Sequence, residues 1–222
     1  MIDQFRRFLS VPVFVSRAWS ELAKLSGDDY RMRSRPGSKQ LIEEVFPVAV
    51  LLLHLWSSTR TVRCRFVGSN KNHDAELTMS GREVDLGYYK SRYYVEVTTA
   101  AHPDEHLRRE ALTRNGFVYL GGPIRRVNEK GAKRRPLVSE AVAVDGESLV
   151  RDVIEWVGAA VVRKSAKDYP RPCILLVNVD AERPLSVKEW AQVQSKVRDR
   201  VDRNRFVHVF AVGCSRNVLV PL

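Results

Sequence analysis

A change in the spacing of apolar residues most restricts the fold of this chain. Residues 39–56 carry apolar side chains at helical spacing, with Ser38 as a suitable N-cap and a bend expected at Pro47. Four segments then alternate between apolar and polar residues, at 61–67, 73–79, 83–89 and 93–99. Because side chains on a strand alternate between two faces, the pattern predicts an antiparallel meander that follows a helix.

The second half of the chain returns to helices and then to buried strands. Residues 103–116 and 146–164 are predicted to be helices, the first with Pro103 at its start and Gly116 at its end. The run PCILLVNV at 172–179 is typical of a central strand covered on both faces, and a helix at 186–202 and a strand at 206–212 follow. This order predicts a mixed α/β (α+β) sheet flanked by helices.

The N-terminal segment is predicted to be an extension of this domain. Residues 28–39 combine charge, glycine and proline without apolar periodicity, so 1–37 form a helical arm with a basic linker and 38–222 form the α/β domain. Arg6 and Arg7 before an apolar stretch imitate a signal peptide, but Asp3 and Pro12 favour a helical extension. The sequence leaves open whether the arm packs on the domain or contacts a second copy or a partner protein.

The charge of the chain indicates a polyanionic partner. There are 37 Lys and Arg residues against 26 Asp and Glu, a net charge of +11, which makes nucleic acid the first candidate. No apolar run is long enough to cross a membrane, and the 3 cysteines lack CxxC spacing, which favours a reducing cytoplasm without disulfides. The arginines expected to contact phosphates lie on the helix at 103–116 and in an irregular basic loop at 121–140: Arg108, Arg109, Arg114, Arg125 and Arg126.

Acidic residues interrupt the strands at regular positions. Glu96 and Thr98 share one face of the strand at 93–99, and Asp74 and Asp85 interrupt the strands before it. If tight turns join these segments, Asp85 pairs opposite Glu96, and several carboxylates share one patch. Such a patch is unfavourable unless a cation lies within it. Mg²⁺ (or Mn²⁺), which accepts one or two carboxylates with waters and phosphate oxygens, accounts for the pattern.

These residues, in this order, resemble the PD-(D/E)XK (restriction-endonuclease-like) nuclease superfamily. The resemblance covers about residues 38–180: a helix with Glu44, the segment HDAEL with Asp74, the strand VEVT with Glu96, and a basic helix after it. It implies an αβββαβ core in which Asp74, Glu96 and the backbone carbonyl of Val97 hold Mg²⁺. Glu44 would provide an outer or second-metal contact, and a buried ion pair explains this residue equally well.

The sequence departs from that family at two positions. His73 stands where proline is usual, and Thr98, near which the attacking water would be aligned, stands where lysine is usual. Threonine brings no positive charge, so the water would be activated chiefly by the metal, or by a lysine from elsewhere such as Lys71 or Lys90. Asp85 remains an alternative to Asp74 as metal ligand.

Two functions follow from the sequence. The first is a metal-dependent endonuclease that hydrolyses phosphodiester bonds in DNA, with RNA the less favoured substrate. The second is a catalytically inactive nuclease fold that binds nucleic acid or serves as a subunit of a larger nucleoprotein complex. Thr98 favours the second function, whereas the clustered acids favour the first.

Overall fold

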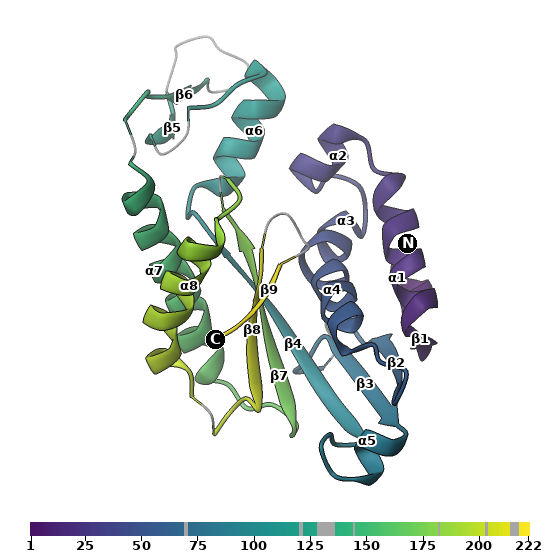
Figure 1. Ribbon diagram of the computed structural model, residues 1–222. Coiled ribbons are helices and arrows are strands. Elements are labelled where there is room, and N and C mark those ends of the chain that lie inside the picture. The colour runs from purple at the N-terminus through teal and green to yellow at the C-terminus, as the bar shows by residue number, and fades with distance from the viewer. Residues whose placement is uncertain are drawn as a thin grey trace.

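A single large sheet organises the chain. The structure is a computed structural model that describes residues 1–68, 71–119, 122–127, 136–143, 145–181, 183–202, 204–213 and 218–222. The sheet has seven strands in the order β1-β2-β3-β4-β7-β8-β9, and β5 and β6 form a separate two-stranded ribbon (Figure 1). The strands are β1 (Leu9–Ser10), β2 (Thr61–Phe66), β3 (Ala75–Ser80), β4 (Arg92–Ala101), β5 (Ile124–Arg126), β6 (Leu137–Ser139), β7 (Cys173–Asp180), β8 (His208–Val212) and β9 (Leu219–Pro221).

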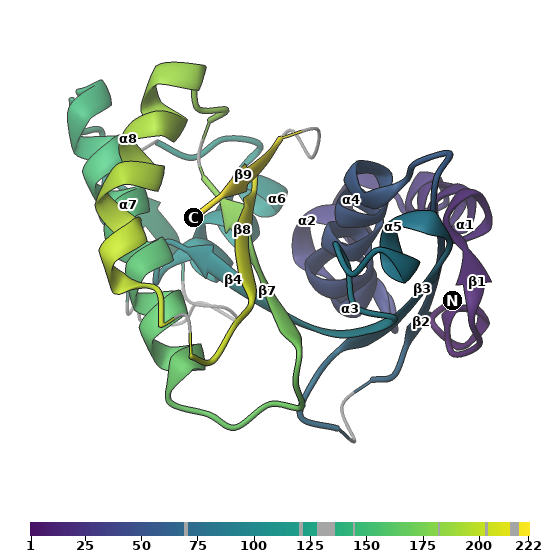
Figure 2. The same ribbon diagram turned by 60° about the horizontal axis from the view of Figure 1, so that its bottom comes forward.

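Helices cover both faces of the sheet. They are α1 (Val11–Ala23), α2 (Gly27–Met32), α3 (Ser38–Gln40), α4 (Phe46–Leu55), α5 (Arg82–Asp85), α6 (Glu105–Asn115), α7 (Gly146–Ser165) and α8 (Val187–Val197). Short turns of other helix types lie at η1 (Asp3–Phe5), η2 (Leu41–Val45) and η3 (Arg198–Arg200). Figure 2 shows α1 and α4 on one side of the sheet and α7 and α8 on the other. Each side has its own apolar core. The predicted mixed α/β architecture is confirmed.

The strand β7 is the centre of the molecule. It pairs in parallel with β4 on one side and with β8 on the other, and every residue from Cys173 to Val179 is buried. Side chains such as Leu176 enter the core under α4, and Leu175 enters the core under α7 and α8. The continuous apolar run had predicted this double coverage, because a strand covered on both faces needs no polar side.

The N-terminal segment belongs to the core of the domain. Phe5, Phe14 and Ala18 are fully buried in the cluster that also contains α4, and Trp19 packs edge-on against Phe46 with ring centroids 4.7 Å apart. The expected linker at 28–39 includes the short helix α2, whose N-cap Ser26 accepts a hydrogen bond from the backbone of residue 29. The arm therefore packs on the body of the protein.

The helix before the meander is less regular than expected. Gly37 rather than Ser38 occupies the N-cap, and the buried Ser38 hydroxyl donates to the carbonyl of Arg35 at 2.7 Å. The irregularity lies ahead of Pro47, in the π-helical turn η2, while Pro47 itself sits in the first turn of α4. A π-helical turn is rare and is often found at a functional site. This one carries Glu43 and Glu44.

The expected strand at 83–89 is wrong. Gly81 takes a positive φ of 113° and the chain enters the four-residue helix α5, where the backbone N–H of Asp85 donates to the carbonyl of Gly81 at 3.0 Å. The meander therefore has three strands, and β3 pairs directly with β4 with Glu76 opposite Tyr94. The cross-strand pairing of Asp85 with Glu96 does not exist.

Three further differences concern the edges of the fold. Sequence periodicity missed the two short edge strands β1 and β9. Part of the segment expected to be an irregular loop at 121–140 forms the ribbon of β5 and β6, and residues 128–135 lie outside the described residues. Among the residues that the structure describes, no helix combines the length and apolar character needed to cross a membrane.

Candidate active site

The site begins where β3 and β4 separate. Their pairing ends at Ala75 and Val95, and the backbone N–H of Asp74 still donates to the carbonyl of Val95 at 2.8 Å. Beyond this point the backbone is no longer paired with β4. The side chain of Asp74 takes the place of the backbone there, because its carboxylate accepts a hydrogen bond from the N–H of Val97 at 2.8 Å. Because the N–H and C=O of one strand residue point to the same side, the carbonyl of Val97 faces this edge as well.

Glu96, which directly precedes Val97 in β4, lies beside Asp74. Its side chain is buried, and it pairs with the ammonium group of Lys164 in the last turn of α7. The carboxyl groups of Asp74 and Glu96 are within hydrogen-bonding reach of each other. Two acids and one lysine thus meet at one point, from the residue directly before β3, from β4 and from α7.

Burial makes this pair of acids a strong binding site for positive charge. It raises the pKa of Asp74 and of Glu96, and the charge of Asp74 raises the pKa of Glu96 further. The hydrogen bond from Val97 and the charge of Lys164 oppose the shift at Asp74, and Lys164 opposes it at Glu96. Like charges in a buried site are relieved by a proton or by a cation between them.

Glu44 faces the same charges from the turn η2. Burial raises its pKa to about 7, and the charges of Asp74, Glu43 and Glu96 contribute. Glu44 is therefore close enough to Asp74 and Glu96 for their charges to interact. No ion pair of Glu44 occurs within the described residues, so the alternative reading of this residue as half of a buried ion pair has no support there.

The raised pKa of Glu44 leads to a stability prediction. The folded protein holds this proton more tightly than the unfolded chain, whose pKa is near 4.5, so Glu44 lowers the free energy of unfolding progressively as pH rises from about 4.5 to about 7. In EDTA, Glu44→Gln should therefore raise Tm at pH 8 and leave it nearly unchanged at pH 4.5. A gain of about 1 kcal/mol corresponds to about 2–4 °C for a chain of this size. Thermal melts monitored by circular dichroism measure it.

A matched control separates this effect from a general loss of surface charge. Asp85→Asn removes an exposed carboxylate on α5 and should shift Tm equally at both pH values. An equal change in Tm at pH 4.5 and pH 8 for Glu44→Gln would contradict the raised pKa of Glu44 in the folded protein.

The lysine that lies beside Glu96 is not one of the two named from the sequence. Lys71 pairs with Glu76 at 3.0 Å, and Lys90 is exposed in the connection between α5 and β4. Lys164 occupies the site instead. The only sequence signal for it is the pair of basic residues that ends the helix before the buried strand β7.

Thr98 has a different partner from the expected water. Its side chain is buried on the same face as Glu96, and its hydroxyl accepts a hydrogen bond from Arg163 at 3.0 Å. Arg163 and Lys164 are consecutive on α7, so one helix end contacts both polar side chains of the strand.

The buried hydroxyl of Tyr169 adds a polar atom without a defined partner. It makes no hydrogen bond of ordinary geometry within the described residues, although burial and the charge of Glu96 raise its pKa. A buried hydroxyl usually has a partner. The carboxyl group of Glu96 is the neighbouring acceptor for this hydroxyl.

The atoms at the site are oxygen donors of the kind that Mg²⁺ or Mn²⁺ accepts. Among the described residues, no three His, Cys, Asp or Glu side chains are grouped to hold a metal ion. Mg²⁺ needs one or two carboxylates and completes its shell with oxygen from water, backbone or phosphate. Asp74, Glu96 and the carbonyl of Val97 would hold it.

Asp85, the alternative metal ligand, lies elsewhere. It is exposed on α5, at the opposite end of β3 from Asp74. The six residues of β3 separate the two by about 20 Å at a rise of about 3.3 Å per residue. Asp74 is therefore the acid that adjoins Glu96.

The arginines expected on an open helix face are mostly engaged within the protein. Arg108 is 4% exposed and donates to the carbonyls of Tyr119 and Gly122 at 3.3 and 2.7 Å, so its expected outward orientation is wrong. Arg109 is largely buried and pairs with Glu105 at 3.0 Å, with Glu43 at 3.7 Å and with Asp180.

The remaining three arginines lie nearer to the surface. Arg114 and Arg126 both pair with Glu110. Arg125, with 70% of its side chain exposed, has a partner in Glu140 at 3.4 Å. Pairing at the surface contributes little stability, so these side chains can exchange a carboxylate for a phosphate at small cost.

Comparisons of this chain with protein-family models, with curated proteins and with solved structures found no match, and the arrangement of Asp74, Glu96 and Lys164 is therefore the basis for assigning a function.

Proposed function

We propose that this protein is a Mg²⁺-dependent endonuclease that hydrolyses phosphodiester bonds in DNA. The observation that carries the proposal is the meeting of Asp74 and Glu96 at the separation of β3 and β4, beside the ammonium group of Lys164. A buried carboxylate and a half-buried one can hold the metal that assists phosphodiester hydrolysis, and a lysine beside them can stabilise negative charge.

Each residue of the site has a distinct part in such a reaction. Asp74 and Glu96 would hold the metal, and the N–H of Val97 fixes the orientation of the Asp74 carboxylate. The bound ion supplies positive charge to the phosphate oxygens and makes water more acidic. Lys164 can donate a hydrogen bond that orients the attacking water and can stabilise the negative charge that develops on the phosphate. Lys164 thus takes the part that the family resemblance gives to a lysine at position 98.

The order of elements supports the same proposal. From α4 onward the chain forms a helix, three antiparallel strands, the helix α6, and then β7 parallel to β4 after a further helix, α7. The order is compatible with the αβββαβ core implied by the resemblance if α5, the ribbon of β5 and β6, and α7 are additional elements. The two acids lie on β4 and directly before β3, at the positions of the motif.

A second function remains because of one specific contact. Lys164 is ion-paired with Glu96, and Thr98 is hydrogen-bonded to Arg163, so both polar groups of β4 already have partners on α7. A nuclease fold that has lost its metal would show such a pairing. It would bind nucleic acid or serve as a subunit of a nucleoprotein complex, with no requirement for a divalent ion.

One incubation distinguishes the two functions. The protein is mixed with supercoiled plasmid and with circular single-stranded DNA, in Mg²⁺, in Mn²⁺ and in EDTA. Circular substrates lack ends, so any cut is endonucleolytic. We expect nicked or linear products with either metal and none with EDTA. Intact circles in all three conditions, together with no heat of Mg²⁺ binding by calorimetry, would favour the inactive fold.

A further inference from the structure

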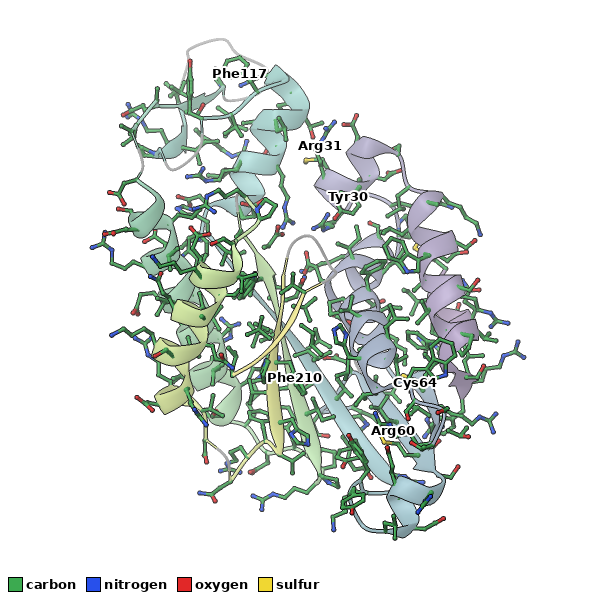
Figure 3. The ribbon with its side chains drawn as sticks, in the orientation of Figure 1. Tyr30, Arg31, Arg60, Cys64, Phe117 and Phe210 are labelled. Atoms are coloured by element: carbon green, nitrogen blue, oxygen red, sulfur yellow. The ribbon has the colours of Figure 1, made fainter. Side chains whose placement is uncertain are left out.

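A basic cleft lies between α2, the turn η2 and α6. Its volume is about 410 Å³, and its walls include five basic side chains: Arg31, Arg33, Lys39, His106 and Arg109. The carboxylates in the lining are those of Glu43 and Glu110. Figure 3 shows Tyr30 and Arg31 on the part of α2 that faces α6.

Two of the arginines form a fixed wall of the cleft. Arg33, held in the left-handed conformation at φ 56°, pairs with Glu43 at 3.5 Å and with Asp180 at 3.7 Å. Arg109 shares both of these partners. This cluster connects the end of α2 to η2, to α6 and to the carboxyl end of β7. It fixes the shape of the cleft, since each charge has more than one partner.

Two other cations are available to a ligand. Arg31 pairs with Asp28 at 2.5 Å, but its Nε atom is buried and makes no hydrogen bond within the described residues. Lys39 is exposed and has no ion-pair partner in that part of the chain. Glu110 is neutralised from outside the cleft by Arg114 and Arg126. The cleft therefore has an excess of positive charge, with one orphaned donor in its wall.

The cleft adjoins the candidate active site. Glu43 lines it and Glu44 is the next residue, and the charge of Lys39 lowers the pKa of Glu44. The cleft lies toward the carboxyl ends of the parallel strands β4 and β7, where ligands of open α/β sheets bind, because two of its arginines pair with Asp180. Glu96 lies nearer the middle of β4, opposite Leu175, so about five strand residues, or about 16 Å, separate it from the level of Asp180. A single strand held at Asp74 and Glu96 would thus reach the cleft within a few nucleotides.

The size of the cleft restricts its occupant. Small-molecule sites occupy about 300–1,000 Å³, and one nucleotide falls within that range, whereas a duplex is far too wide to enter. We propose that the cleft is a subsite for one nucleotide of a single-stranded segment, whose phosphate contacts Arg31 and Lys39 while another phosphodiester of the same strand lies at the two acids. This inference rests on the proposed function and narrows its substrate to single strands and frayed ends.

The test measures binding without catalysis. In EDTA, fluorescence anisotropy gives the affinity for a labelled oligothymidylate and for a blunt duplex of equal length, and calorimetry gives the affinity for thymidine monophosphate against thymidine. Arg31→Ala and Lys39→Ala should each weaken binding of the single strand and the monophosphate about tenfold, which is about 1.4 kcal/mol, and change duplex binding much less. Each should also reduce the salt slope by about one.

Lys188→Ala and Lys196→Ala are the matched controls. They remove exposed lysines from α8, on the other side of the sheet, and should leave all affinities unchanged. Lys39→Glu should weaken the single-strand complex more than Lys39→Ala, because it adds a repulsive charge. Unchanged melting temperatures confirm that the variants are folded.

The outcomes separate this inference from the proposed function. Equal losses for duplex and single strand, or no loss in either variant, would overturn the nucleotide subsite even if the protein cleaves DNA. Specific loss of single-strand binding would support it even if no metal-dependent cleavage occurs, because the binding is measured in EDTA.

Discussion

Glu96→Gln and Asp74→Asn are each expected to abolish metal-dependent cleavage of DNA. Both changes keep the shape of the side chain and remove its charge, and the amide oxygen introduced by Asp74→Asn could still accept the hydrogen bond from Val97. The cost should be at least about 10²–10³-fold in rate, the range found when one preorganised charge-stabilising group is lost. Single-turnover cleavage of circular DNA at saturating Mg²⁺ measures this rate, and calorimetry should show weaker Mg²⁺ binding.

Asp85→Asn provides the control for this experiment. It removes an acid of the same type from an exposed position on α5 and should cleave DNA at the wild-type rate. The melting temperature of Asp74→Asn in EDTA should equal or exceed that of the wild type, because the change removes repulsion between the two acids and leaves the pair of Glu96 with Lys164 intact. Full cleavage activity of both Glu96→Gln and Asp74→Asn would exclude these two acids as the metal site.

The sequence predicted the parts of the site that depend on one strand. Alternation along β4 places Glu96 and Thr98 on one face, and the structure buries both there. It also predicted β7 correctly, because a run without polar residues can be satisfied only between two covered faces. These features are local, and a period of two or a continuous apolar run is sufficient to show them.

The same alternation led to a wrong prediction of a strand at residues 83–89. The segment EVDLGYY fits a period of two, but a pattern of this length also fits a turn of helix. Gly81 decides the outcome, because its φ of 113° redirects the chain, and a Cβ there would lie 2.8 Å from the carbonyl oxygen of Thr59. Both the positive φ and the close approach of residue 59 favour glycine at this position, and the alternation of apolar residues shows neither.

The arginines of α6 show a second limit. Charge and helical spacing suggested that Arg108 faces outward, yet the carbonyls of Tyr119 and Gly122 fold over it from the next segment. The sequence pattern around an arginine that donates to buried carbonyls is the same as the pattern around an arginine that binds phosphate. The contact between Lys164 and Glu96 was not predicted for a related reason, since 68 positions separate the two residues in the sequence.

Replacement of Lys164 tests whether the ammonium group from α7 has the role of the lysine absent at position 98. Lys164→Ala should lower the cleavage rate about 10²-fold or more, within the range attributed to positioned proton-transfer groups. It should also cost about 1–3 kcal/mol of stability, because Glu96 loses a buried partner. The loss of stability should be larger at pH 8 than at pH 5, because the pKa of Glu96 is already raised and protonation at low pH removes the unpaired charge.

The double variant Lys164→Ala with Thr98→Lys provides the decisive comparison. Position 98 lies on the same face of β4 as Glu96, so a lysine there can return an ammonium group to the acids, while the exposed Arg163 can turn toward solvent. We expect the double variant to recover much of the activity lost in Lys164→Ala. Lys167→Ala, which removes a more distant charge near Glu96, should have little effect. Wild-type activity in Lys164→Ala would show that the lysine only neutralises Glu96 in the metal-free protein. Loss without rescue would mean that activity requires the approach of the ammonium group from α7, because charge alone would then be insufficient.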